Sequence, residues 1–497
     1  MEQAIIFFTR MPIPGQTKTR LFDFVSPDQA CEIQRKLIQN IDKILMEREE
    51  DIFVFYTPVN HERELRELIR SQASYHTQCE GDLGQKMSSA IQEVLKGGYE
   101  SVLLMGSDLA ALDNARIDRA FSALINHDVV INPSIDGGYT IIGMNEAHSG
   151  IFQLTSFEND TVYGKTIARI HELLLSVYEL DPMLDIDTKE DLLKMYLGTD
   201  SIKLIGADRD YISYAYSTGN EKRILIVNTG SQMLLENRII YEYDALKILE
   251  KSGVTPKAFH YYDGKGLIPH VMLEAEFLEG RPLDYCSDMH IAAYLLYRVH
   301  ALAIPENHGL HFAEKPFKDI YDECIEMAER YFEWTKRDEE TANKITYFLK
   351  RASEMGLEDE LSSKSIINTE LNSGNFIINL KKEYSHIVGW QNAMIGEKEQ
   401  DLACFLAPTT TFLKTDVILS NEEMEDFLVE YERYAPVNRE RVRKYLCITC
   451  LRVIALSAMT LAEYESQDLI PKYAYNCQKA REYLSPEFLR IIETYFE

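Results

Sequence analysis

The segment 11–20 combines a stiff backbone with positive charge. Pro14 and Gly15 lie at its centre, and Lys18 and Arg20 follow two residues apart. An arginine can hold phosphate oxygens in a bidentate fork and a lysine acts as a point charge, so this loop suits a di- or triphosphate. The alternative interpretation is an ordinary solvated turn with basic residues.

Two acidic positions are candidates for holding a divalent cation. Asp108 follows the apolar run 101–105, and an aspartate at the end of a central strand can hold a cation that neutralises phosphate charge. Asp185 and Asp187 follow a second strand-like run, 174–180, and point to the same side of an extended chain. We expect Mg²⁺ or Mn²⁺ at Asp108, with one of Asp185 and Asp187 as a second ligand. Helix N-capping is the alternative role for each aspartate.

Two glycine-containing strings complete the candidate site. Gly81 and Gly84 stand at the start of a helical pattern, where an intervening aspartate can also be a simple N-cap. Asp136 and Gly138 lie between two apolar runs, and an Asp-Gly pair there indicates a hairpin. Glycines also let the backbone approach a substrate closely, so the hairpin and a substrate-binding role are compatible.

The elements that position these strings alternate between strand and helix patterns over residues 1–200. Helical patterns cover segments such as 28–46 and 85–95. Strands are expected at residues 4–8, 52–56, 101–105, 128–132 and 139–144. This alternation predicts an α/β domain with a parallel, doubly wound sheet. Ligands bind such sheets at the carboxyl ends of the strands, which is where the four strings fall.

Five strings in this order, PxPGxxKTRL, GDLGQKM, GSDLAAL, DGGYTIIGM and DIDTKEDL, resemble the radical-SAM/selenodomain-associated transferase family (domain of unknown function 2064). The same frame is similar to the guanylyltransferases of coenzyme F420 biosynthesis, and the resemblance covers nearly all of residues 1–195. It implies a GT-A-like nucleotide-diphospho-sugar transferase fold, phosphate contacts at Lys18 and Arg20, and metal binding at Asp108 and Asp187. The resemblance also implies pocket roles for Gly81, Gly84, Asp136 and Gly138. Where the family suggests an acceptor-side Trp-Ser-Thr, residues 157–161 read FENDT, so the acceptor is expected to differ.

The resemblance leaves two reactions open. A glycosyltransferase breaks the sugar–phosphate bond of a nucleotide sugar, and a nucleotidyltransferase breaks the α–β phosphate linkage of a nucleoside triphosphate. Both depend on electrostatic stabilisation of a departing phosphate group by a metal and by cations. The family label favours sugar transfer to a small-molecule acceptor, whereas the pair of Lys18 and Arg20 also suits a triphosphate.

Residues 201–497 have a different pattern. Segment 203–280 predicts a small β-rich lobe with one helix near 238–252, and a mostly helical lobe is expected over 284–497. Within that lobe, segment 365–396 is expected to form two short strands and a turn. A small β lobe followed by a large helical lobe is an α+β bilobal arrangement.

Several strings in this second half resemble the aminoglycoside phosphotransferase and choline kinase superfamily, over roughly residues 205–460. Glu242 lies in RIIYEYDALKIL, where the family has its helix-C glutamate. The string INTELNSGNF matches the catalytic loop HGDLHPGNF and contains Glu370 and Asn375. The string VGWQNAMIGEKEQDLA matches the metal-binding segment, with Gly389 at the metal-ligand position and Asp401 at an aspartate expected to be structural.

Most of the residues that catalysis needs in this kinase-like frame are missing. Phosphoryl transfer needs a base, metal ligands and a cation on the phosphates. Glu370 replaces the catalytic aspartate, Gly389 cannot bind a metal through a side chain, and strand 224–228 contains no lysine or arginine. Asn375, a possible metal ligand, remains. We therefore expect a pseudokinase that binds a ligand or acts as a scaffold. Small-molecule phosphotransferase activity and a purely non-enzymatic binding role are the alternatives.

Composition limits the partners. The formal net charge is −28, with 18 basic and 32 acidic residues in 1–200 and 34 and 48 in 201–497. An evenly acidic chain argues against nucleic acid as a partner.

The apolar stretch 445–462 contains Arg452 and a CxxC pair, and we expect a buried helix with core thiols instead of a membrane span or a zinc site. We expect a cytoplasmic protein, and we keep a homo-oligomer as an open alternative to a monomer.

Overall fold

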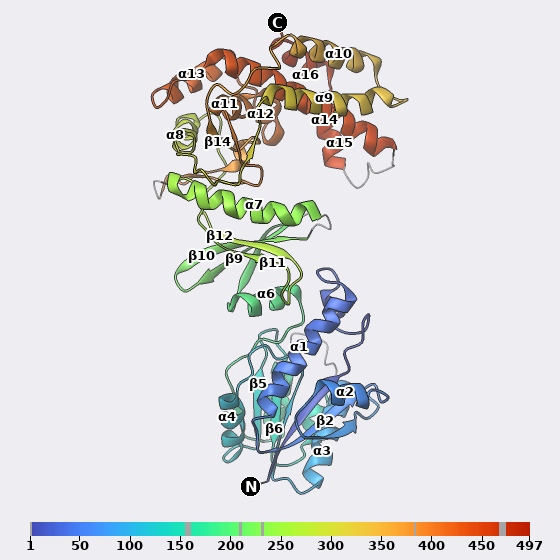
Figure 1. The fold of residues 1–497 in the computed structure, drawn as a ribbon. Helices are drawn as coiled ribbons and strands as arrows, with labels where there is room; N and C mark the ends of the chain where they lie inside the picture. Colours follow the sequence, from blue (N-terminus) through green and yellow to red (C-terminus); the bar gives the residue numbers. More distant parts are fainter. Residues whose placement is uncertain (1, 155–160, 208–210, 230–232, 382–383, 467–473) are drawn as a thin grey trace. The chain divides into compact units, whose positions relative to one another are not determined.

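The computed structural model describes residues 2–154, 161–207, 211–229, 233–381, 384–466 and 474–497. The chain forms two compact units (Figure 1). The first comprises residues 1–203, 216–219 and 264–269, and the second comprises residues 204–215, 220–263 and 270–497. Each unit has hydrophobic core residues of its own, and its strands and helices pack around them.

The first unit is built on a seven-stranded sheet with the order β3-β2-β1-β4-β6-β5-β7. β6 runs antiparallel to its neighbours β4 and β5, and the remaining neighbouring pairs are parallel. The strands are β1 (Gln3–Arg10), β2 (Asp51–Thr57), β3 (Ala73–Thr77), β4 (Ser101–Met105), β5 (Val129–Pro133), β6 (Tyr139–Met144) and β7 (Val177–Glu179).

The prediction of an entirely parallel sheet is wrong at β6. Residues 134–138 separate β5 from β6, and five residues are too few for a parallel crossover, which takes a dozen or more. The hairpin predicted from the Asp-Gly pair is confirmed, with Asn132 opposite Ile141 and Ile131 opposite Ile142. The α/β class is therefore correct, with a mixed sheet.

Helices pack on both faces of this sheet. Ile5 and Phe7 of β1 belong to a core shared with residues of α1, α2 and α4, whereas Ala4 and Ile6 belong to a core shared with α3 and α5. Alternate side chains of a strand point to opposite faces, so β1 is apolar on both sides and central. The helices are α1 (Pro27–Leu45), α2 (Glu62–Leu68), α3 (Leu83–Lys96), α4 (Asn114–Leu124), α5 (Val162–Glu172) and α6 (Lys189–Leu197).

A small lobe of the second unit contains a five-stranded sheet with the order β11-β12-β10-β9-β8 and the long helix α7 (Met233–Leu249). The strands are β8 (Ile202–Ala207), β9 (Tyr211–Thr218), β10 (Glu221–Asn228), β11 (Ala258–Asp263) and β12 (Val271–Glu276). α7 contacts β11 and β12, which agrees with the expected small lobe of sheet and helix.

The rest of the second unit is mainly helical, as expected. Segment 365–396 differs in detail, because it contains four short strands instead of two: β14 (Ser365–Ile367), β15 (Phe376–Ile377), β16 (His386–Ile387) and β17 (Met394–Gly396). The helices are α8 (Met289–His300), α9 (Pro316–Glu333), α10 (Glu339–Ser353), α11 (Lys398–Leu406), α12 (Pro408–Lys414), α13 (Asn421–Glu432), α14 (Arg439–Ser466), α15 (Ala474–Tyr483) and α16 (Pro486–Glu493).

Helix α14 is long and apolar enough, by length and composition, to cross a membrane. In its most apolar stretch, 67% of the residues are buried inside the protein, and the helix packs against α9, α11 and α15. Core helices of folded domains pass the same test of length and composition. Cys447 and Cys450 are buried on this helix, and burial raises the pKa of the Cys447 thiol to about 11, as for an unreactive core thiol.

Candidate active site

Lys18 lies at the centre of the candidate site in the first unit. Its ammonium is 3.1 Å from Oδ2 of Asp108 and 3.3 Å from Oδ1 of Asp187, and it also donates to the carbonyl of Ile186. The backbone of Lys18 has φ 51° and ψ 44°, the left-handed conformation that few side-chain-bearing residues adopt. Only 5% of its side chain is exposed. All three ammonium protons therefore have protein acceptors.

Burial by itself would lower the pKa of the Lys18 ammonium. The carboxylates of Asp108 and Asp187 outweigh that effect and raise the pKa above its ordinary value. Arg20 also contacts Asp187, at 3.1 Å from its Oδ2, but 66% of its side chain is exposed. Of the two cations expected to bind phosphate, Arg20 is thus accessible as it stands, and Lys18 is engaged with the carboxylates.

A short antiparallel bridge brings the two aspartates together. Asp108 follows β4, and residues 184–187 precede α6. The amide of Ile186 donates to the carbonyl of Asp108 at 3.0 Å, and the amide of Ala110 donates to the carbonyl of Leu184 at 3.2 Å. These bonds hold the acidic string beside the carboxyl end of a central strand, where an α/β sheet binds its ligands.

Asp136, Asp185 and Asp187 form a second carboxylate group, with ligand oxygens within 4.8 Å of one another. Burial, with the charges of Asp136 and Asp187, raises the pKa of Asp185 to about 7. Asp136 also accepts a hydrogen bond from the Gly138 amide at 3.1 Å, which shapes the β5–β6 turn. Carboxylate oxygens are the ligands that Mg²⁺ and Mn²⁺ prefer, and the ammonium of Lys18 already stands where a cation would satisfy Asp108 and Asp187. The residues present therefore fit a divalent cation.

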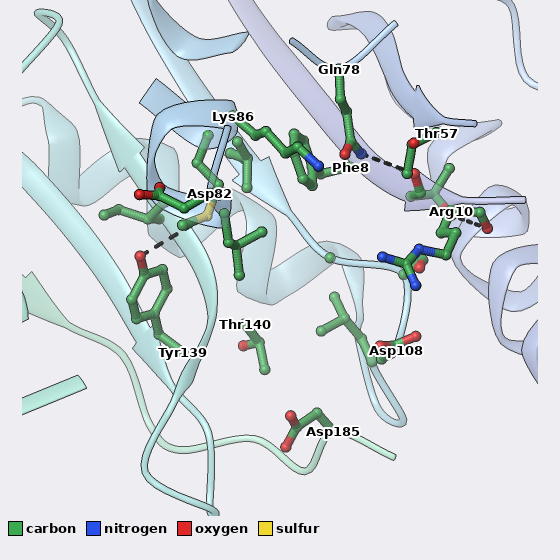
Figure 2. Close-up of a pocket in the computed structure, with 18 of the residues that line it drawn as sticks. Phe8, Arg10, Thr57, Gln78, Asp82, Lys86, Asp108, Tyr139, Thr140 and Asp185 are labelled. Carbon is green, nitrogen blue, oxygen red and sulfur yellow. Dashed lines mark hydrogen bonds between the residues drawn. The ribbon is translucent and has the colours of Figure 1, made fainter. Parts of the chain in front are cut away.

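A cavity of about 870 Å³ opens beside these carboxylates (Figure 2). Its walls come from β1, β2, α3, β4 and β6, and it contains Asp108 and Asp185. A smaller cavity of about 250 Å³ contains Lys18 and Arg20 and shares Arg10, Ser107 and Asp108 with the larger one. Two connected cavities, one with the cations and one larger, match a ligand with a phosphate end and a larger organic end.

The glycine-rich strings contribute mainly backbone. Asp82 is the N-cap of α3, because its carboxylate accepts from the Gln85 amide at 2.8 Å and Gln85 bonds back to the Asp82 amide. Gly81 has φ +122°, and Gly84 is buried in the first turn of α3. The side chains of Asp82 and Lys86 line the larger cavity, so this helix N-terminus faces it.

Six of the predicted pocket residues do not line either cavity. Pro14 and Gly15 are exposed, and Gly15 has φ +80°. The six residues that are not among the walls of the two cavities are Pro14, Gly15, Gly81, Gly84, Asp136 and Gly138. The departure from the family at residues 157–160 lies outside the described residues.

The structure adds residues that the sequence did not single out. Gln78 donates to the carbonyls of Thr9 at 3.0 Å and Phe55 at 3.2 Å, and it lines the larger cavity with Arg10 and Lys86 (Figure 2). Arg10 ends β1 directly before the basic loop, so the rule that ligands bind at strand ends could have found it. Gln78 and Lys86 had no comparable signal, since only the fold brings them to the same cavity.

In the second unit, the kinase-like residues occupy one region but do not form a metal site. Glu242 on α7 accepts a hydrogen bond from the Trp390 amide at 3.0 Å, and burial raises the pKa of its carboxyl. Gly389 has φ +79°, and a Cβ there would lie 2.7 Å from Nδ2 of Asn375. Asn375 in turn donates to the Val388 carbonyl at 3.1 Å. The position expected to bind a metal is therefore filled by backbone and by an amide.

Asp401 holds the loop that contains Glu370. Its carboxylate is fully buried and accepts from the amides of Asn368 and Thr369 at 2.8–3.0 Å. Nε2 of His300 lies 3.2 Å from the same carboxylate. The structural role expected for Asp401 agrees with these contacts.

Glu370 lines a third cavity, of about 640 Å³. Its other walls come from α9, α12, α14 and α15 and include Arg452, Lys479 and Tyr483. Arg452 pairs with Glu323 through two bonds of 2.8 and 3.0 Å. The cavity is large enough for a small organic molecule and has both charged and apolar walls.

Comparison with known proteins defines the two units as transferase folds. Residues 40–158 match the family described as uncharacterized proteins conserved in bacteria (DUF2064), and residues 202–445 match the phosphotransferase enzyme family. A crystal structure from Desulfovibrio desulfuricans G20, assigned to the nucleotide-diphospho-sugar transferases, is 30% identical and covers 40% of this chain and 88% of its own, with a TM-score of 0.38. The first unit is therefore related to this protein and matches the DUF2064 family, and the second unit matches the phosphotransferase enzyme family.

Two further solved structures resemble the second unit. Spectinomycin phosphotransferase APH(9)-Ia is 14% identical and covers 60% of this chain and 92% of its own, with a TM-score of 0.42. Aminoglycoside phosphotransferase APH(4)-Ia is 14% identical and covers 60% and 97%, also with a TM-score of 0.42. No curated protein matches the chain. The predicted folds, GT-A-like and then kinase-like, are confirmed, and both families are transferases.

Proposed function

We propose that the first unit transfers a glycosyl group from a nucleotide sugar to a small-molecule acceptor, with Mg²⁺ or Mn²⁺ as its metal. The observation that carries this proposal is the convergence of Lys18, Arg20, Asp108 and Asp187 in the 250 Å³ cavity, which shares Asp108 with the 870 Å³ cavity. The relative that is 30% identical supports the donor class. The bond that breaks is between the sugar and the diphosphate.

Each residue has a stated task in this proposal. Asp108 and Asp187 would hold the metal, which supplies positive charge to the departing diphosphate. Arg20, whose guanidinium is exposed, binds the phosphate oxygens in a bidentate fork. The larger cavity, with Gln78 and Lys86 in its walls, binds the nucleoside or the sugar and orients it toward the acceptor.

Nucleotidyl transfer is the alternative reaction for the same site. Lys18 and Arg20 lie on one loop and line the same small cavity. This cavity also suits the longer phosphate chain of a nucleoside triphosphate. The products separate the two reactions. Sugar transfer releases a nucleoside diphosphate, whereas nucleotidyl transfer releases pyrophosphate.

The test is product analysis with the full chain and Mn²⁺. A panel of nucleotide sugars and nucleoside triphosphates is incubated with cell-derived small molecules, and nucleoside diphosphate and pyrophosphate are measured by chromatography. Release of nucleoside diphosphate from a nucleotide sugar, lost in D108N and kept in D118N, supports sugar transfer. Release of pyrophosphate from a nucleoside triphosphate, lost in D108N and kept in D118N, supports the alternative. If neither product is released, the proposal that the first unit is a transferase of these classes is refuted.

For the second unit, we propose a pseudokinase that binds a small organic molecule without transferring phosphate to it. The 640 Å³ cavity at Glu370 supports the binding role, and the glycine at the metal position supports the loss of catalysis. Hydrolysis or transfer of the γ-phosphate of ATP, measured with the full chain and Mg²⁺, is expected to stay at background. Turnover that disappears in E370Q would show that this unit is an active phosphotransferase.

A further inference from the structure

Three protein acceptors surround the ammonium of Lys18. Oδ2 of Asp108 lies at 3.1 Å, Oδ1 of Asp187 lies at 3.3 Å, and the third acceptor is the carbonyl of Ile186. An ammonium has three donors and no acceptor. Every donor of Lys18 is therefore used inside the protein, and none is left for a phosphate.

The position of this ammonium matters because Asp108 and Asp187 are the carboxylates proposed to hold the metal. A metal bound to the same two carboxylates would lie close to the ammonium, and the two positive charges would repel each other more strongly than they would in bulk water. We infer that Lys18 is a tethered cation that competes with the divalent metal for Asp108 and Asp187. Without a metal, the ammonium of Lys18 holds Asp108 and Asp187 together and offsets part of their negative charge.

The surroundings give a displaced Lys18 other partners. The smaller cavity contains Lys18 and also Gln34, whose Oε1 is buried without a hydrogen-bond partner among the described residues. The Nε2 of Gln34 is fixed by Ser107, at 3.0 Å from its hydroxyl, so Oε1 stays oriented as an acceptor. Phosphate oxygens of a bound nucleotide would be stronger acceptors in the same cavity, because they are charged.

This arrangement couples metal binding to nucleotide binding. A metal that binds alone must displace the ammonium of Lys18 from two carboxylates, whereas a metal that binds with a nucleotide leaves the ammonium with new anionic partners. Coupling between two ligands is reciprocal, so each one raises the affinity for the other. The backbone of Lys18 suits such a residue, since its left-handed φ of 51° is held by the surrounding contacts.

The inference rests on the proposed metal site and is tested by metal affinity, without any turnover. Free Mn²⁺ is measured by electron paramagnetic resonance during titration of the full chain in the absence of nucleotide. The D108N variant gives the background from other acidic residues. K18M is expected to bind Mn²⁺ at least about tenfold more tightly than the wild type, because a competing charge is removed. K189M is the matched control, since Lys189 pairs with Asp23 near the same loop and is expected to behave like the wild type.

Equal or weaker Mn²⁺ binding in K18M would overturn the competition while leaving the metal site intact. No binding above the D108N background in either protein would refute the metal site and the competition together. A second measurement uses the unmodified chain, in case K18M folds poorly. Lys18 is acetylated with an amine-reactive ester, and the extent is read by mass spectrometry. Its modification is expected to rise several-fold with Mn²⁺, relative to Lys189, and an unchanged ratio would contradict the inference.

Discussion

A Cβ atom on Gly389 would lie 2.7 Å from Nδ2 of Asn375, closer than real side chains approach. Gly389 also has φ +79°, a backbone conformation that L-residues rarely adopt. The local backbone conformation therefore favours glycine at this position. An aspartate here would adopt a strained conformation and would have to displace the side-chain amide of Asn375.

From this contact we predict that G389D destabilises the second unit and does not restore metal-dependent ATP binding. The expected loss is about 1–3 kcal/mol of unfolding free energy, from backbone strain and steric overlap. Urea titration of the full chain measures the loss, and calorimetry with Mg²⁺ and ATP measures binding. G309A is the matched control, since Gly309 has φ +64° in open space and reports the backbone strain alone. A stable G389D that binds ATP with Mg²⁺ would show a catalytic site that one substitution can recover.

We also predict that D401N is strongly destabilising. The fully buried carboxylate of Asp401 accepts backbone N–H groups from Asn368 and Thr369 and contacts His300. An asparagine amide would place donors against donors, at a cost of about 3 kcal/mol. Chemical denaturation should show this loss, whereas D426N, on the exposed face of α13, should change stability by less than about 0.5 kcal/mol. A small effect for D401N would show that Asp401 does not stabilise the loop that contains Glu370.

The sequence predicted the elements better than their directions. The strands 101–105 and 139–144 were predicted at their observed bounds, because each is a β-rich apolar run flanked by turn residues. Two predictions disagree on the direction of β6: the strand–helix alternation predicts a parallel strand, whereas the Asp-Gly pair predicts the hairpin that the structure confirms. The 134–138 link decides between them, because five residues are too few for a parallel crossover.

The candidate site was predictable as a set of strings but not as a set of contacts. Asp108 and Asp187 were singled out as metal ligands from their positions after strands. The bond from Lys18 to Asp187 spans 169 residues, and nothing in either string indicates that the ammonium turns toward carboxylates. The bridge between Leu109 and Asp185 decides this geometry, and such long-range pairing depends on the complete fold.

A pH dependence is predicted for Glu242. Burial raises the pKa of its carboxyl above the ordinary 4.5, so the folded state holds a proton that the unfolded state releases as the pH rises. Stability from this group is present below the ordinary pKa and is lost as the pH rises through the raised one. E242Q keeps an oxygen for the Trp390 amide and cannot ionise. Its melting temperature should match the wild type near pH 4 and exceed it at pH 8.

Melting curves between pH 4 and pH 8 test this sign directly. E422Q, at an exposed position of α13, is the control and should follow the wild type throughout. If E242Q instead loses stability relative to the wild type as the pH rises, the charged form of Glu242 is the stabilised one. In that case a cation outside the contacts described above must pair with it.

The last prediction concerns the metal in the first unit. Thermal unfolding of the full chain is followed with a nucleotide sugar at about 100 times its dissociation constant, with and without Mn²⁺. Such a ligand stabilises the wild type by about 2.7 kcal/mol, and we expect the shift only with Mn²⁺. D108N should lose the Mn²⁺-dependent shift, because the cation loses one of two anchoring carboxylates. D118N should keep it, since Asp118 pairs with Arg48 at 2.7 Å and does not line either cavity. A D108N variant that keeps the full shift would place the metal at Asp136, Asp185 and Asp187, and D136N should then abolish it.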